Sequence, residues 1–160
     1  MMRVGHGFDA HRLVVGRRLV LGGVEIPSER GALGHSDADA LAHAVADALL
    51  GSLALGDLGQ HFPDSEERWK DADSLELLAA CVALVHARGY RVGNLDATIV
   101  VERPRLAAFT ETMRCNLAAR CGVDASAVSV KAKSSEGMGY TGDGTGIAVY
   151  AVATVEPIAS

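Results

Sequence analysis

The first residues of the chain alternate between two faces in the manner of a β-strand. Over residues 2–9, every second side chain shares a face: Met2, Val4, His6 and Phe8 on one, and Arg3, Gly5, Gly7 and Asp9 on the other. If this strand continues, His11 joins the face that carries Asp9. Further strands are expected at residues 18–26, 94–102, 127–133 and 146–155, the first of them interrupted by Gly22-Gly23.

Three other stretches carry apolar residues at helical spacing. The first helix is expected to begin at Ser36 or Asp37, both good N-cap residues, and to end near Ala54. Two more helices are expected at residues 74–88 and 105–120, each followed by a glycine that favours a helix end.

The order of these elements is β-β-α-α-β-α-β-β. It predicts an α+β fold, with a single mixed β-sheet and a layer of helices on one face. Residues 57–73 are polar and rich in helix breakers, which indicates a loop that belongs to a site rather than a linker. The last strand is apolar on both faces over residues 147–153. The sheet therefore needs a second covering layer, and we expect a neighbouring subunit to provide it.

Composition narrows the class of protein. Half of the residues are apolar and 22% are charged, which is typical of a folded domain. The net charge is −5 and no run of Lys and Arg exceeds two residues, which argues against a nucleic-acid partner. No apolar stretch is long enough to predict a membrane span. Cys81, Cys115 and Cys121 lack a paired spacing, and with no signal peptide they indicate a reducing, cytoplasmic location.

Asp9, His11 and His43 are the first candidate site. Side chains at i and i+2 of a strand point the same way, so Asp9 and His11 converge from one surface. His43 follows near the start of the first expected helix. Two histidines and one carboxylate, with a coordination position left open, are typical of a catalytic zinc site. The alternative is that the Asp-x-His triplet lies in a solvated loop.

Polar residues also gather immediately before that helix, in His35-Ser36-Asp37-Ala38-Asp39. An ordinary capped N-terminus accounts for part of this pattern, because acidic side chains there face the positive end of the helix dipole. It does not account for His35. Free backbone N–H groups at such an end also suit a phosphate group.

The third candidate is the glycine-rich stretch from residue 131 to residue 146. Its glycines allow a ligand to approach the backbone closely. Glu136 is a candidate ligand for a hard cation, and Lys133, Ser134 and Ser135 can donate hydrogen bonds to phosphate. Alternatively, the stretch is only a mobile turn. Arg103 and Arg105, which follow a strand and open a helix, could hold a phosphate or could be ordinary surface arginines.

Several short blocks occur together along nearly the whole chain. They are Arg3-Val-Gly-His-Gly-Phe-Asp-Ala-His11, Leu21-Gly-Gly-Val-Glu-Ile-Pro27, His35-Ser-Asp-Ala-Asp39 with His43, Asp47-Ala-Leu-Leu-Gly51, Ala54-Leu-Gly-Asp-Leu-Gly59, Phe62-Pro-Asp64 and Gly139-Tyr-Thr-Gly142. With these blocks the chain resembles the 2-C-methyl-D-erythritol 2,4-cyclodiphosphate synthase family of the non-mevalonate isoprenoid pathway.

The resemblance implies a phosphorus–oxygen lyase that converts 4-diphosphocytidyl-2-C-methyl-D-erythritol 2-phosphate to the 2,4-cyclodiphosphate and releases CMP. It implies one zinc ion per subunit at Asp9, His11 and His43, and a Mg²⁺ or Mn²⁺ ion, held partly by Glu136, on the substrate diphosphate. His35 and Ser134 are then expected to support the transition state. We further expect a single catalytic domain over residues 1–160, a ferredoxin-like or chorismate-mutase-like fold, and a homotrimer with its sites between subunits.

The same matching gives the expected substrate contacts. On the methylerythritol side they are Asp57, Gly59, Phe62, Pro63, Asp64 and Glu66. On the cytidine diphosphate side, which the adjoining subunit is expected to supply, they are Val101, Arg103, Arg105, Leu106, Ala107, Lys133, Ser134, Ser135 and Glu136. Further substrate contacts are expected at Asp9, His11, His35, Ser36, Tyr140 and Asp143.

The chain departs from the family pattern at three positions. Lys133-Ser134-Ser135 replaces a run of threonines, Asp143 replaces an arginine often assigned to ligand binding, and Arg105 replaces a common lysine. We expect Lys133 to restore part of the positive charge lost at Asp143. Two other functions stay open from the residues alone: a zinc-dependent phosphodiesterase that uses water as its nucleophile, and a non-catalytic nucleotide-binding module.

Overall fold

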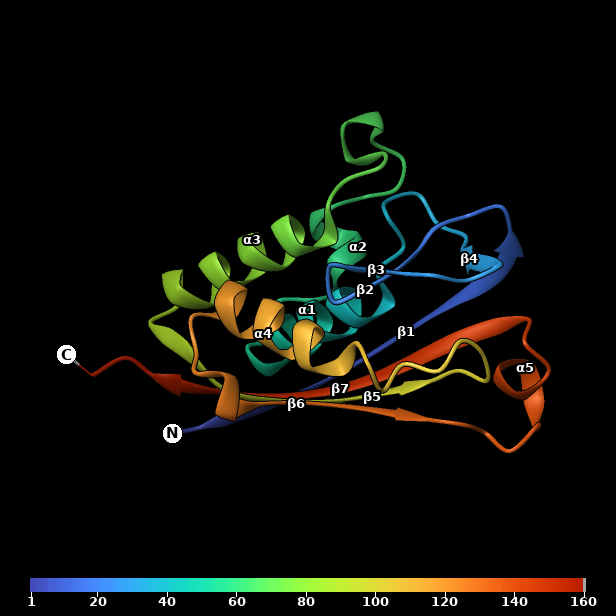
Figure 1. The fold of residues 1–160 in the computed structure, drawn as a ribbon. Coiled ribbons are helices and arrows are strands. Elements are labelled where there is room, and N and C mark those ends of the chain that lie inside the picture. The colour runs from blue at the N-terminus through green and yellow to red at the C-terminus, as the bar shows by residue number, and fades with distance from the viewer. Residues whose placement is uncertain (160) are drawn as a thin grey trace.

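The main sheet is built from five strands whose order is β4-β1-β7-β5-β6. The computed structural model describes residues 1–159 (Figure 1). The strands are β1 (Arg3–Val15), β4 (Arg30–Ala32), β5 (Tyr90–Val100), β6 (Val128–Lys133) and β7 (Gly146–Pro157). β5 and β6 run parallel, whereas the other neighbouring pairs run antiparallel. The predicted α+β class with one mixed sheet is confirmed.

Three long helices cover one face of this sheet, and no long helix of residues 1–159 lies on the other (Figure 1). They are α1 (Ala40–Ser52), α3 (Ser74–Ala87) and α4 (Thr110–Cys121). Short turns of helix lie between them and near the chain's last strands: α2 (Leu58–His61), η1 (Glu67–Trp69), η2 (Ala125–Ala127) and α5 (Gly139–Gly142). Leu78 of α3 and Leu117 of α4 are fully buried in the core.

Helix α1 rests directly on the backbone of β1. A Cβ atom added at Gly5 would lie 1.8 Å from the carbonyl oxygen of Ala48, and one added at Gly7 would lie 1.9 Å from that of Ala44. Only glycine permits such an approach. Ala44 and Ala48 are themselves fully buried, so small residues on both sides bring helix and strand together. This contact sets the distance between the strand that carries Asp9 and the helix that carries His43.

The start of α1 differs from the prediction. Its N-cap is Asp39, not Ser36 or Asp37, and the Asp39 carboxylate accepts from the backbone N–H of Ala42. Ala38 has a left-handed backbone with φ of 56°, which interrupts the helix before this point. Ser36 and Asp37 instead make contacts of their own, described below.

Asp39 also anchors a hairpin to the helix. Residues 18–26 were expected to form one interrupted strand, but they fold into two, β2 (Leu19–Leu21) and β3 (Val24–Ile26), which pair only with each other in a separate small sheet. Gly22 and Gly23 make the turn with positive φ, and both donate backbone hydrogen bonds to the carboxylate of Asp39 at 2.9 and 2.8 Å. Burial raises the pKa of Asp39 to about 6, although these backbone donors favour its ionised form.

We expect Asp39→Ala to lower the free energy of unfolding by about 3 kcal/mol or more. The change removes a helix cap, worth ~1 kcal/mol. It also leaves the buried N–H group of Gly22 without a partner, at ~1–3 kcal/mol, and removes the acceptor of the more exposed N–H group of Gly23. Urea denaturation followed by circular dichroism measures the loss. Asp124→Ala, which removes the cap of the exposed turn η2, is the control and should change stability little. Equal effects at the two sites would contradict the anchoring role.

Other boundaries also differ from the prediction. β1 extends past residue 9 to Val15, because Leu13 to Val15 pair with the unpredicted strand β4. α4 begins at Thr110 rather than residue 105, since residues 101–109 form bends and turns around a cis Arg103–Pro104 peptide bond. In contrast, β6 and β7 lie close to their predicted bounds.

The face of the sheet opposite the helices carries exposed apolar side chains. Phe8 on β1 is 45% exposed, and its ring centroid lies 5.2 Å from that of Tyr150 on β7, which is 46% exposed. Val4 and Val152 lie on the same face and are also exposed. Because Val149 and Ala151 of β7 point into the core, the prediction that this strand is apolar on both faces is confirmed.

Candidate metal centre and active site

Asp9, His11 and His43 come together at the contact between β1 and α1. The Asp9 Oδ2 atom lies 2.9 Å from Nε2 of His11 and 3.0 Å from Nδ1 of His43. One ligand atom of each residue lies within 4.8 Å of the other two. The i, i+2 geometry expected of Asp9 and His11 is therefore present, because β1 continues through both residues.

The electrostatics of the three residues are those of a cation site. Nδ1 of His11 donates to the carbonyl oxygen of Leu33 at 3.0 Å, so in the neutral ring the lone pair of Nε2 faces the Asp9 carboxylate. Two electron pairs facing each other require a positive charge between them. Burial alone would raise the pKa of Asp9, but the hydrogen bonds and charges of His11 and His43 outweigh it and lower the pKa to about 2. Asp9 in turn raises the pKa of His11 against the opposing effect of its burial.

The donor set fits a divalent metal ion. Zinc takes imidazole nitrogen and carboxylate oxygen at about 2.0–2.2 Å, and the three donor atoms converge closely enough for an ion to sit among them. Without an ion, a proton on His11 supplies the positive charge between His11 and Asp9. An ion that binds there must displace this proton. We therefore expect metal affinity to rise with pH.

A pocket of about 360 Å³ opens above these three residues. The predicted substrate contacts that line it are Asp9, His11, His35, Ser36, Gly59, Phe62 and Asp64. Asp57, Pro63 and Glu66 are not among its lining residues. Asp57 instead caps α2, and the backbone carbonyl of Glu66 lies 3.3 Å from Nε2 of His35.

Several residues of this pocket were not predicted from the sequence. Trp69 lines it, and its ring stands edge-on to that of Phe62 with centroids 5.0 Å apart. Asp47 lines it too, and burial raises the pKa of its carboxyl group. Leu33, Leu58 and Leu77 supply apolar wall. Trp69 could have been predicted, because it is a large aromatic residue in a polar loop. Asp47 could not, because its pattern is that of an ordinary polar residue of a helix.

The predicted nucleotide residues line a second, separate pocket of about 370 Å³. It is formed by residues 101–107 together with 132–134, and it shares no residue with the pocket of the metal trio. Val101, Arg103, Arg105, Leu106, Ala107, Lys133 and Ser134 are thus brought together as expected. Within one chain, however, Ser134 and Glu136 do not join Asp9, His11 and His43.

The remaining predicted residues lie in the connection between β6 and β7. Glu136 has φ of 55°, and its N–H donates to Oγ of Ser134 at 2.8 Å. Ser135 bonds to Thr141 at 2.7 Å, and the ring of Tyr140 lies against Gly146. Asp143 accepts from Thr145 and lines a neighbouring pocket with Arg30, Arg103 and Arg105.

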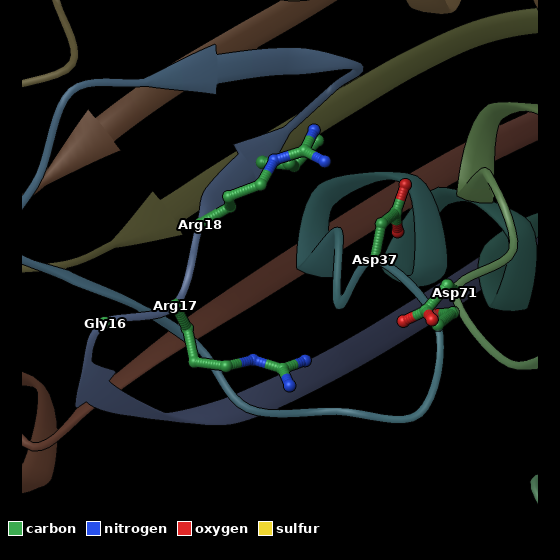
Figure 2. A pocket seen from close by; sticks show the side chains of 7 residues that line it. Gly16, Arg17, Arg18, Asp37 and Asp71 are labelled. Atoms are coloured by element: carbon green, nitrogen blue, oxygen red, sulfur yellow. The ribbon is translucent and has the colours of Figure 1, made fainter.

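A further pocket, of about 300 Å³, lies beside the segment that leads into α1 (Figure 2). Arg17 and Arg18 reach it from the link between β1 and β2, and Asp37 and Asp71 come from the segments before α1 and α3. It shares Ser36 with the pocket of the metal trio. Arg17 donates to the carbonyl oxygen of Gly34 at 3.1 Å and thereby holds this segment from the outer side.

Comparison with known proteins decides the family. The YgbB family profile matches residues 2–156. The chain belongs to the YgbB family. Among YgbB-related proteins, the 2-C-methyl-D-erythritol 2,4-cyclodiphosphate synthase of Trichlorobacter lovleyi is 55% identical over 98% of this chain and 99% of its own length. The resemblance predicted from the sequence is confirmed, and the chain is thereby placed in a family of enzymes.

Solved structures of YgbB-related proteins share the fold. A 2C-methyl-D-erythritol-2,4-cyclodiphosphate synthase in a form bound to CDP has a TM-score of 0.89 and 36% identity over 96% of this chain and 100% of its own. The bifunctional IspDF of Campylobacter jejuni has a TM-score of 0.95 and 35% identity over 99% of this chain. The match covers 43% of that longer chain.

The helices and the cysteines were also compared with the predictions from composition. Within residues 1–159, no helix has the length and apolar character needed to cross a membrane. Cys81, Cys115 and Cys121 are all free thiols, and Cys81 is buried in the core.

Proposed function

We propose that the chain is a 2-C-methyl-D-erythritol 2,4-cyclodiphosphate synthase, a metal-dependent lyase of isoprenoid biosynthesis. The proposal rests above all on the convergence of Asp9, His11 and His43 at the floor of a pocket, in a chain 55% identical to a relative of that name. The substrate would be 4-diphosphocytidyl-2-C-methyl-D-erythritol 2-phosphate. The products would be the 2,4-cyclodiphosphate and CMP.

The reaction is an internal phosphoryl transfer. An oxygen of the 2-phosphate forms a bond to the β-phosphorus, and the bond from that phosphorus to the oxygen bridging to the α-phosphate breaks, so CMP leaves. The attacking oxygen is already anionic, so no general base is needed. Because both groups belong to one molecule, holding them in line can supply up to ~7–11 kcal/mol of the barrier reduction.

The main obstacle is repulsion between the anionic phosphates. Zinc held by Asp9, His11 and His43 would supply positive charge to the β-phosphate, and Mg²⁺ or Mn²⁺ near Glu136 would do the same between the α- and β-phosphates. The protein's own charge is −5, so its composition suits a site that relies on cations rather than on a basic pocket. His35 and Ser134 would hold the reacting phosphates in place.

We infer that the working form is a homotrimer with active sites between subunits. Two observations support this. The metal trio and the nucleotide residues occupy separate pockets of one chain, so a complete site needs a second chain. The uncovered sheet face presents Phe8, Tyr150 and Val152, which a subunit packed there would bury. We further propose that residues 1–160 act as one catalytic domain, of the ferredoxin-like or chorismate-mutase-like kind, in the cytoplasm.

One assay tests the function. The purified protein is incubated with the cytidyl substrate, zinc and Mg²⁺, and the products are identified by phosphorus NMR. CMP and the cyclic diphosphate in equal amounts are expected. Linear phosphate products would instead support the phosphodiesterase, and tight nucleotide binding without CMP would support the binding module. Size-exclusion chromatography with light scattering should give three times the mass of the 16.6 kDa chain.

Lys133 is expected to compensate for the arginine that Asp143 replaces. It lines the nucleotide pocket with Arg103 and Arg105, so its ammonium group would face the diphosphate. Lys133→Ala should raise KM by up to about 5-fold with a smaller effect on kcat, because a single exposed charge pair is worth about 1 kcal/mol or less. Lys131→Ala, which breaks a surface pair with Asp96, is the control. An unchanged KM for Lys133→Ala would show that Lys133 does not compensate for the replaced arginine.

A further inference from the structure

His43 is held at both nitrogens of its ring. Nδ1 faces Asp9 within the trio, whereas Nε2 lies 2.7 Å from Oγ of Ser74, the first residue of α3. Ser74 is only 1% exposed, so this second contact is shielded from solvent. The orientation of the His43 ring is therefore decided partly from outside the trio, by a residue 31 positions further along the chain.

The hydrogen bonds that join Asp37, Ser74 and His43 have only one possible donor–acceptor direction. The Ser74 hydroxyl donates to Oδ1 of Asp37, because an ionised carboxylate can only accept. A hydroxyl has a single proton, so Oγ of Ser74 must accept from His43. Nε2 of His43 then carries the ring proton, and the lone pair lies on Nδ1 and points at the centre of the trio.

Asp37 is itself firmly held. The backbone N–H of Ser74 donates to its Oδ2 at 3.0 Å, and the N–H of Asp39 donates to its Oδ1 at 3.1 Å. Its own N–H donates to the carbonyl oxygen of Ala72 at 3.2 Å. These bonds join the segment before α1 to the start of α3. Asp37, Ser74 and His43 are thus connected by part-buried hydrogen bonds, with the buried Ser74 in the middle.

Ser36 offers a weaker contact to the same nitrogen. Its Oγ lies 3.2 Å from Nε2 of His43 and accepts from the N–H of Ala38 at 3.3 Å. Among residues 1–159 no carboxylate accepts its proton, and its Oγ lies 3.5 Å from that of Ser74, a contact in which either hydroxyl can donate, so Ser36 sets no direction on the His43 ring. The geometry therefore favours Ser74 as the residue that decides the tautomer.

We propose that Ser74 and Asp37 are positioning residues for the metal ligand His43. They fix the neutral tautomer in which Nε2 donates to Ser74 and Nδ1 faces the ion. Neither residue was among the substrate or metal residues predicted from the sequence. The inference rests on the metal site of the proposed function. It extends that site outward to the loop before α1 and to the first turn of α3, beside the pocket shown in Figure 2.

Zinc affinity without substrate is the direct test, measured by competition with a chromophoric chelator at pH 7.5. Ser74→Ala is expected to weaken zinc binding by about 10–100-fold, as loss of a partner to a ligating histidine commonly does. Asp37→Asn should weaken it as well, because an amide cannot accept all the bonds that the carboxylate accepts. Ser74→Thr keeps the hydroxyl and should bind zinc more tightly than Ser74→Ala.

The matched control is Asp73→Ala. Asp73 caps the same end of α3 through the N–H of Leu75 at 2.9 Å but does not contact His43. It should lower the melting temperature and leave zinc affinity unchanged. A folded Ser74→Ala protein with wild-type zinc affinity would overturn the proposal. So would an equal loss of affinity in Asp73→Ala, since that would be a merely structural effect.

A second measurement does not depend on any variant. Long-range ¹H–¹⁵N correlation spectra of the zinc-loaded protein should show His43 protonated at Nε2, and a proton on Nδ1 would overturn the inference. Wild-type protein that binds zinc but releases no CMP would defeat the proposed activity and leave this inference standing. Wild-type protein that binds no zinc would defeat both.

Discussion

Asp9→Asn should abolish stoichiometric zinc binding and lower kcat by at least ~10²–10³-fold, the usual cost of removing one preorganised electrostatic group. The Asp9 carboxylate is the only negative charge among the three ligands, and its Oδ2 lies within 3.0 Å of both imidazoles. An amide of the same shape keeps an oxygen but loses the charge that holds a divalent ion. Metal analysis of the purified variant by mass spectrometry, beside the CMP assay, measures both effects.

The same variant has a consequence in the protein without metal. Asp9 raises the pKa of His11 against the lowering effect of burial. With the carboxylate gone, only the hydrogen bond to Leu33 and the charge of Asp39 still oppose the effect of burial, so the pKa of His11 should fall from its raised value. An NMR titration of the ring protons reports it. Asp96→Asn, at an exposed pair on β5, is the control and should keep its zinc. One zinc per chain together with wild-type turnover in Asp9→Asn would refute the assignment of the trio.

Gly7→Ala is expected to be among the most destabilising single changes in the chain. The added Cβ would lie 1.9 Å from the carbonyl oxygen of Ala44 and 2.7 Å from the N atom of Ala48. Both are backbone atoms of α1, so no side chain can turn aside, and the helix must move. Overpacking commonly costs about 1–3 kcal/mol, and a clash with helix backbone should reach or exceed the upper end of that range. Urea denaturation measures the loss.

The displaced helix also carries His43, next to Ala44. We therefore expect the folded fraction of Gly7→Ala to bind zinc more weakly than wild type, which chelator competition can measure. Gly51→Ala is a matched control on α1 itself. Its Cβ would meet nothing closer than 3.8 Å, and replacing glycine within a helix should stabilise the protein by up to ~1 kcal/mol. Loss of stability in both variants would show that α1 tolerates no added methyl group, and would contradict the specific role of the α1–β1 contact.

Local sequence patterns predicted the helices and strands more reliably than the residues at which they begin and end. Alternation predicted β1 and the apolar repeat predicted α3, because both periodicities follow directly from backbone geometry. The start of α1 was misplaced, since Ser36, Asp37 and Asp39 are all good caps and only tertiary contacts choose among them. Asp37 bonds to Ser74, and Asp39 bonds to the hairpin turn at Gly22 and Gly23. β4 escaped prediction because a three-residue strand carries too short a pattern.

The strand that presents Asp9 and His11, the helix that carries His43 and the membership of the family could all be predicted from residue patterns. How these parts meet follows only from the folded chain. It shows α1 seated on the glycines of β1, the metal trio separated from the nucleotide pocket within one chain, and Ser74 bonded to His43 across 31 residues. The physical reason is that periodicity and residue type act over a few neighbouring positions, whereas a hydrogen bond or a close packing contact depends on distances in space that the folded chain alone sets.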